Sequence, residues 1–184
     1  MRSVSDYTKQ KIASILRGGD SSAGILAMLR RGAGKRPGDD PALWGILFDG
    51  MPEDMMGKRG IPSRAEWAVY AALTLFAVHQ QGKDLKRDCM HKAGISFGQA
   101  AAGLAESKKD ADRIIRRFNQ AVTADGIEGI TYHLRGMISM LRRKDIPLDY
   151  AKLAKDLYFL QTSSASVTRL EWGQDFYKEL NKKA

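Results

Sequence analysis

Residues 64–81, which read RAEWAVYAALTLFAVHQQ, form the most apolar stretch of this 184-residue chain. Apolar side chains cover most of the circumference of a helix drawn through it, and a helix that is apolar all round is buried. We therefore expect a central core helix here. The apolar part, 65–78, is too short to cross a bilayer and contains a tryptophan and a tyrosine, so no membrane partner is expected.

The segments on both sides of this stretch also have apolar residues at intervals of three and four, and almost nowhere in alternation, which is typical of helices. Three expected helix starts carry a capping residue followed three places later by an acid or amide: Ser63 with Glu66, Ser96 with Gln99, and Asp125 with Glu128. Two more are expected to have a proline in the first turn, Pro41 and Pro147.

We therefore predict an all-α fold, a compact bundle of about nine short helices. The expected ranges are 5–17, 22–31, 41–48, 64–81, 97–106, 108–123, 126–143, 148–161 and 165–181. One domain over residues 1–184 is expected. Apolar density falls and charge rises over residues 82–95, which favours an N-terminal lobe, 1–82, and a C-terminal four-helix lobe, 96–184.

The composition favours an acidic partner. Lys and Arg number 30 against 21 Asp and Glu, a formal charge of +9, as in proteins that bind nucleic acid or anionic membranes. The single cysteine, Cys89, excludes an internal disulfide framework and fits a reducing cytoplasm. The first sixteen residues lack the apolar run of a signal peptide, so a cytoplasmic location is expected.

The cations gather in three clusters. The first lies in the glycine-rich segment 29–38, and the second lies on the polar face of the expected helix 108–123, opposite an apolar stripe. The third is on the next helix and at its end. The cations of the three clusters are Arg30, Arg31, Lys35, Arg36, Arg113, Arg116, Arg117, Arg135, Arg142 and Arg143. Helix dipoles and solvation explain any one of them, whereas the whole set predicts a surface that binds a polyanion.

Catalysis is not indicated, and no cofactor is expected. The only close metal-ligand pair is Cys89 with His91, and no second pair lies near it in the sequence. A nuclease would need clustered carboxylates, but paired acids such as Asp39 and Asp40 lie at expected helix caps and in loops, which accounts for their presence. Segment 32–35 resembles a phosphate-binding loop in composition alone, because no strand precedes it.

Aromatic residues that could stack on bases are expected in the core instead. Trp44, Trp67 and Phe118 all lie at apolar helical spacing. His79, near the end of the expected core helix, is expected to be structural.

Six local motifs, in this order, resemble the CasB family, the small subunit of the type I-E CRISPR Cascade complex. They are LRRG at 29–32 with the Gly, Lys and Pro that follow, LFAVHQQG at 75–82, ISFG at 95–98, RRF at 116–118, IPLDYA at 146–151 and WGQDFY at 172–177. Together they span nearly the whole chain. Gln99 departs from the family pattern, in which arginine is common, so the resemblance implies no nucleic-acid contact at this position.

The resemblance implies an all-helical, non-catalytic subunit that is present as two copies in an RNA-guided complex. Its partners would be guide RNA, target and displaced DNA strands, other Cascade subunits and a second copy of itself. In such complexes base pairing reads the sequence, and the protein needs only a cationic track for the backbone. The alternative is a helical assembly protein whose basic clusters bind acidic protein surfaces without nucleic-acid contact.

Overall fold

The computed structural model describes residues 3–182, of which Lys108 and Lys109 are described in their backbone alone. These residues form nine α-helices: α1 Val4–Arg17, α2 Ser21–Gly32, α3 Trp44–Phe48, α4 Arg64–His79, α5 Phe97–Gly103, α6 Lys108–Thr123, α7 Gly126–Arg143, α8 Tyr150–Phe159 and α9 Ala165–Asn181. Two short 3-10 turns, Pro41–Leu43 and Glu53–Met55, complete the helical structure. Extended pairing over the described range is limited to two isolated bridges. The all-α prediction is confirmed.

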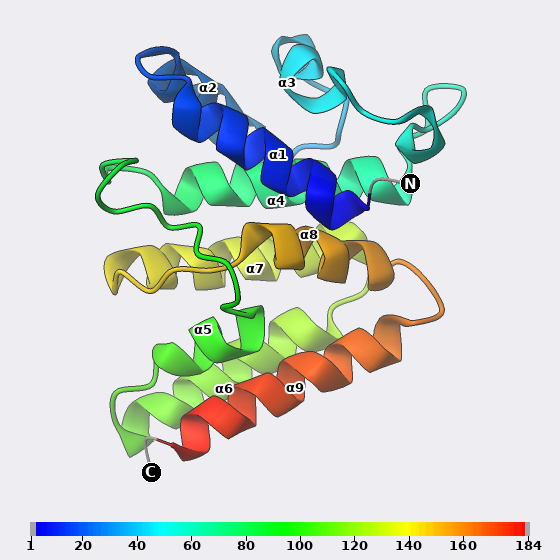
Figure 1. The fold of residues 1–184 in the computed structure, drawn as a ribbon. Helices are drawn as coiled ribbons and strands as arrows, with labels where there is room; N and C mark the ends of the chain where they lie inside the picture. Colours follow the sequence, from blue (N-terminus) through cyan, green and yellow to red (C-terminus); the bar gives the residue numbers. More distant parts are fainter. Residues whose placement is uncertain (1–2, 183–184) are drawn as a thin grey trace.

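Helix α4 is the centre of the fold, as its sequence predicts. Every residue from Ala68 to His79 is buried, and helices α1, α2, α7 and α8 pack around α4 (Figure 1). At its N-terminal half the Tyr70 hydroxyl donates to the carbonyl of Gly32, 2.8 Å away, and so ties α4 to the end of α2. Within residues 3–182 no helix is both long and apolar enough to span a bilayer.

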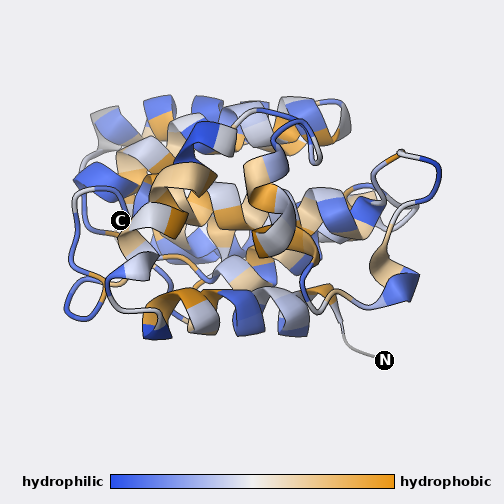
Figure 2. Cartoon of the chain, turned by 90° about the horizontal axis from the view of Figure 1, so that it is seen from above, coloured by the Kyte–Doolittle hydropathy of each residue, from blue (hydrophilic) through white to orange (hydrophobic). Residues whose placement is uncertain are grey.

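Helices α5, α6 and α9 form the other end of the molecule (Figure 1). Their core is aromatic: the ring centroids of Phe97 and Trp172 are 4.6 Å apart, and those of Phe118 and Phe176 are 4.2 Å apart. Gly98 lets α5 approach α9 closely, because a Cβ at this position would lie 2.3 Å from the carbonyl oxygen of Trp172. Figure 2 shows hydrophilic and hydrophobic residues alternating along the outer helices, as expected where one face of each is buried.

Helix α8 joins the two ends, because it packs on α1 and α4 and also contacts α9. The indole nitrogen of Trp172 donates to the buried carboxylate of Asp156 at 2.8 Å, and Lys152 lies 3.3 Å from the same side chain. Burial raises the pKa of Asp156, and the bonds from Trp172 and Lys152 partly offset that shift. The division of the chain into lobes 1–82 and 96–184 stays a prediction.

The predicted helix starts are confirmed at some positions and wrong at others. Ser63 and Ser96 each form a complete capping box, and Pro41 begins a 3-10 turn. Asp125 precedes α7, but its side chain makes no cap hydrogen bond. Its expected partner Glu128 lies 3.8 Å from Arg36 instead.

Helix α8 begins two residues later than predicted, and Pro147 lies outside it. The backbone of Leu148 pairs with Met90 and Lys92, which holds this segment extended. The helix then begins at Tyr150, where the Asp149 side chain accepts from two backbone amides of the first turn. The cap, not the proline, therefore sets the start.

Trp44 is not in the core, which corrects the prediction for that residue. It is 48% exposed, and its indole nitrogen donates to the carbonyl of Gly38 at 3.1 Å. Leu43, which ends the 3-10 turn before the single-turn helix α3, and Leu47 within α3 are four residues apart and both buried, so the neighbouring Trp44 points outward. Phe118 is buried as predicted, and Trp67 is half-buried.

Candidate nucleic-acid interface

Arg135 lies where predicted cations of α2 and α7 come together. It is an exposed residue of α7, and its guanidinium donates to the carbonyl of Ala33 at 3.1 Å. Ala33 caps the C-terminus of α2, where the helix dipole favours a cation. Gly34, with φ of 89°, turns the chain there, and a Cβ would lie 3.3 Å from the Arg135 guanidinium. Arg135 therefore joins α7 to the loop that follows α2.

Two hollows adjoin at Arg135. One, of about 790 Å³, lies between α2, the end of α4 and α7, and is lined by Arg30, Arg31, Arg135 and Arg142. The other, of about 600 Å³, lies between α6 and α7 and is lined by Arg117 and again by Arg135. Ser139 also lines both. We call these hollows together the basic groove, defined by Arg30, Arg31, Arg117, Arg135 and Arg142.

The basic groove suits an anion because of what surrounds its arginines. Its other polar lining side chains are neutral groups such as Gln81, Gln120 and Ser139, and the residues the structure describes place no carboxylate in either lining. Arg142 donates to the side-chain oxygen of Gln81, which fixes its position without neutralising its charge. Arginine binds phosphate well, since its planar guanidinium presents several donors in a fixed geometry.

Five of the ten predicted cations lie outside the basic groove, and four of these are exposed arginines. Arg36 pairs with Glu128 at 3.8 Å, and Arg113 pairs with Asp110 at 3.0 Å. Such exposed pairs are weak, so both arginines keep access to solvent. Arg116 and Arg143 are exposed and line neither hollow.

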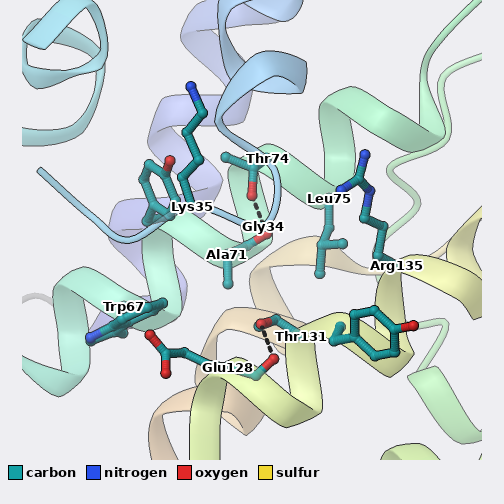
Figure 3. A pocket seen from close by; sticks show the side chains of 11 residues that line it. Gly34, Lys35, Trp67, Ala71, Thr74, Leu75, Glu128, Thr131 and Arg135 are labelled. Carbon is teal, nitrogen blue, oxygen red and sulfur yellow. Dashed lines mark hydrogen bonds between the residues drawn. The ribbon is translucent and has the colours of Figure 1, made fainter. Parts of the chain in front are cut away.

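The tenth cation, Lys35, borders a third and smaller cavity. This cavity, of about 210 Å³, lies between α4 and α7, and Arg135 lines it as well (Figure 3). Arg135 is thus shared by all three hollows.

The metal-ligand pair that the sequence offered is engaged elsewhere. The ring nitrogen Nδ1 of His91 accepts from the backbone amide of Tyr150 at 3.1 Å, and burial raises the pKa of the Cys89 thiol, which disfavours the thiolate that binds metal. His79 is fully buried, with Nδ1 2.8 Å from the Tyr150 hydroxyl. Across the described part of the chain, no three His, Cys, Asp or Glu side chains are placed to hold a metal ion.

A family model described as CRISPR-associated protein Cse2 matches residues 25–177, which is most of the chain. The chain belongs to the Cse2 family. Comparison with curated proteins gives no match.

Solved structures of CasB proteins agree with this Cse2 assignment. CasB from Thermobifida fusca is 32% identical, with a TM-score of 0.78 over 95% of this chain and 97% of that one. CasB from M. ruber is 22% identical, with a TM-score of 0.68 over 98% of this chain and 96% of that one. CasB from Thermus thermophilus is 19% identical, with a TM-score of 0.67 over 93% and 97%. The last two show the shared fold alone.

The resemblance to the small subunit of type I-E Cascade is thereby confirmed. As a member of the Cse2 family the chain is a Cascade subunit in CRISPR defence, and it associates with other subunits of that complex.

Gln99, where this Cse2 sequence departs from the family pattern, has a structural role at the start of α5. The side-chain oxygen of Gln99 accepts from the backbone amide of Ser96 at 2.9 Å and so completes the capping box of α5. Gln81, Gln120, His133 and Ser139, which also line the basic groove, were not predicted. They are recognised as groove residues only because the fold places them between arginines, and no sequence pattern predicts that position.

Proposed function

We propose that this Cse2-family chain binds polynucleotide backbone through the basic groove. The observation that carries the proposal is the sharing of Arg135 by two hollows whose other cations come from three separate helices. Such a surface stabilises a guide–target duplex and the displaced strand of an R-loop by neutralising phosphates, while base pairing reads the sequence. Guide RNA, target DNA, displaced DNA and a second copy of the chain in one complex are the partners of this proposal.

The proposed role is non-catalytic and cytoplasmic. Cse2 is a structural subunit of Cascade, and binding by charge alone needs no cofactor. The sequence's single cysteine supports a reducing compartment.

Salt dependence tests the proposal. If the five arginines of the basic groove each meet one phosphate of a single strand, log affinity should fall with log salt at a slope of about −3.5. We expect Arg31→Ala combined with Arg117→Ala to make that slope shallower by about 1.4, since two phosphate contacts are lost. The assay is fluorescence anisotropy of an end-labelled strand at several salt concentrations.

A second double variant gives the matched control. Arg116→Ala with Arg143→Ala removes the same charge from exposed positions outside the basic groove. It should leave the slope nearly unchanged. Equal effects of the two double variants would mean that total charge, and not the basic groove, binds the strand.

Protein binding is the second candidate function, and one observation favours it. Val167, Leu170 and Tyr177 are 57%, 61% and 47% exposed, and all three are on α9. Exposed apolar residues grouped on one element are typical of protein contacts. Co-purification of the Arg31/Arg117 double variant with the other Cascade subunits separates the candidates: retained assembly with lost strand binding favours nucleic acid as the ligand of the basic groove.

A further inference from the structure

The small cavity between α4 and α7 has the size for one planar group. Its volume is about 210 Å³, below the roughly 300–1,000 Å³ typical of pockets for drug-sized ligands. Figure 3 shows its walls: Trp67, Ala71 and Leu75 from α4 on one side, and Glu128 and Thr131 from α7 on the other. A large ligand is therefore excluded, and a single ring system fits.

The walls offer flat apolar surface for such a ring. The half-buried Trp67 and the buried Tyr70 present aromatic surface, and Ala71 and Leu75 add aliphatic contact. Tyr132 also lines the cavity, and it is 76% exposed, the most exposed of the large apolar side chains of the described chain. Every nucleobase has a π-face that stacks on aromatic side chains, so these walls suit a base.

Four polar side chains on the α4 and α7 walls of the cavity can accept hydrogen bonds: Tyr70, Thr74, Glu128 and Thr131. The hydroxyls of Thr74 and Thr131 donate to carbonyls of their own helices, at 3.1 and 3.0 Å. The Tyr70 hydroxyl donates to the carbonyl of Gly32, and burial raises the pKa of Tyr70 to about 12, so it keeps its proton at neutral pH. Because these hydrogens are engaged, the three hydroxyl oxygens can only accept from a ligand. The Glu128 carboxylate can accept as well, since its pair with Arg36 is exposed and 3.8 Å long.

Two cations, Lys35 and Arg135, lie where a nucleotide with its base in the cavity would have its phosphate. Lys35 borders the cavity, and Arg135 belongs both to this cavity and to the basic groove. In Figure 3 the Lys35 side chain points away from Glu128 and Thr131, which leaves the acceptors and the ammonium group in different parts of the site. A nucleotide held here would have its base against acceptors and its phosphate against cations.

We propose that this cavity binds one unstacked nucleobase of a strand whose phosphates lie on the basic groove, a proposal that rests on the function proposed above. The acceptor-rich walls favour bases with exocyclic amino groups. Adenine, cytosine and guanine present such N–H donors, whereas thymine and uracil present two carbonyl oxygens and a single N–H. The site therefore adds a modest base preference to a contact that is otherwise indifferent to sequence.

The experiment compares two labelled strands by fluorescence anisotropy: a short deoxycytidine homopolymer and the same sugar-phosphate strand without bases. The chain should bind the deoxycytidine strand about fivefold or more tightly, the effect expected of stacking one base on an aromatic side chain. Tyr132→Ala removes an exposed ring, and Thr131→Leu fills the cavity, and neither changes a cation. Both variants should lose the preference for the strand with bases and keep their affinity for the strand without them.

Two further variants complete the design. Tyr177→Ala removes another exposed tyrosine, one on α9 that does not line this cavity, and should keep the preference. Glu128→Gln replaces a pure acceptor by an amide that also donates, so the preference of deoxycytidine over thymidine strands should shrink.

Each outcome decides between the two proposals. Equal affinity of the unmodified chain for the strands with and without bases would overturn the base site, as would an unchanged preference in Tyr132→Ala and Thr131→Leu. If the strand without bases still binds through Arg31 and Arg117, the basic groove stands without the base site. Failure of both strands to bind overturns both proposals.

Discussion

Lowering the pH from 7 to 5 should destabilise the folded chain through His79. Its side chain is fully buried at the end of α4, with Nδ1 2.8 Å from the Tyr150 hydroxyl. Burial is the main cause that lowers the pKa of His79 to about 4 from an ordinary value of 6.5. The positive charges of Lys83 and Arg142 act in the same direction, and nearby backbone carbonyls partly oppose them.

The size of the effect follows from the two pKa values. The unfolded chain protonates this histidine near pH 6.5 and the folded chain near pH 4. Between these values the unfolded state binds more protons, so the free energy of unfolding falls as the pH falls. The full difference is about 3 kcal/mol, and about 2 kcal/mol of it is lost by pH 5. For a chain of this length that loss lowers Tm by about 4–8 °C.

Urea unfolding at several pH values between 7 and 5 measures this loss. Carboxylates also titrate in this range, so the comparison is between the unmodified chain, His79→Gln, and the control His133→Gln on α7. The unmodified chain and the control should lose about 2 kcal/mol more than His79→Gln between pH 7 and 5. The reasoning is refuted if His79→Gln loses as much stability as the other two proteins.

Other predictions concern packing and capping, and urea unfolding at pH 7 checks each. Gly98→Ala should lower the free energy of unfolding by about 1–3 kcal/mol, because its Cβ would lie 2.3 Å from the carbonyl oxygen of Trp172. Gly173→Ala, in α9 with open space around its Cβ, should instead stabilise by about 0.4–1 kcal/mol. Asp149→Ala removes the cap of α8 and should cost about 0.5–2 kcal/mol. Trp172→Phe leaves the buried Asp156 without its indole donor and should cost about 1–3 kcal/mol.

Most of the helices could be predicted from the sequence because their signals are local. Capping boxes at Ser63 and Ser96 fix two helix starts through contacts within four residues. The apolar spacing of 108–123 predicts that Phe118 is in the core, and the structure confirms it. The start of α8 was misplaced because Leu148 pairs with Met90, a contact between segments far apart in the chain.

The candidate site could be predicted only in part, for a related reason. The sequence identifies arginines on exposed helix faces, but not which faces meet across the fold. Arg30 and Arg142 face one hollow because α2 and α7 both pack on α4. Arg113 points to the same side of α6 in the helical pattern as Arg117, yet it pairs with Asp110. Trp44 was misjudged because a one-turn helix is too short for its periodicity to show which side is buried.

The packing of α1 against α8 has a consequence for how the chain is made. Val4–Arg17 has one of its main neighbours in Tyr150–Phe159, which leaves the ribosome much later. At synthesis rates of about 5–20 residues per second, the apolar face of the first helix waits roughly 7–27 s for that neighbour. Nascent chains that end before α8 is made are therefore expected to engage chaperones. Truncation before residue 150 should give protein that aggregates instead of a smaller folded unit.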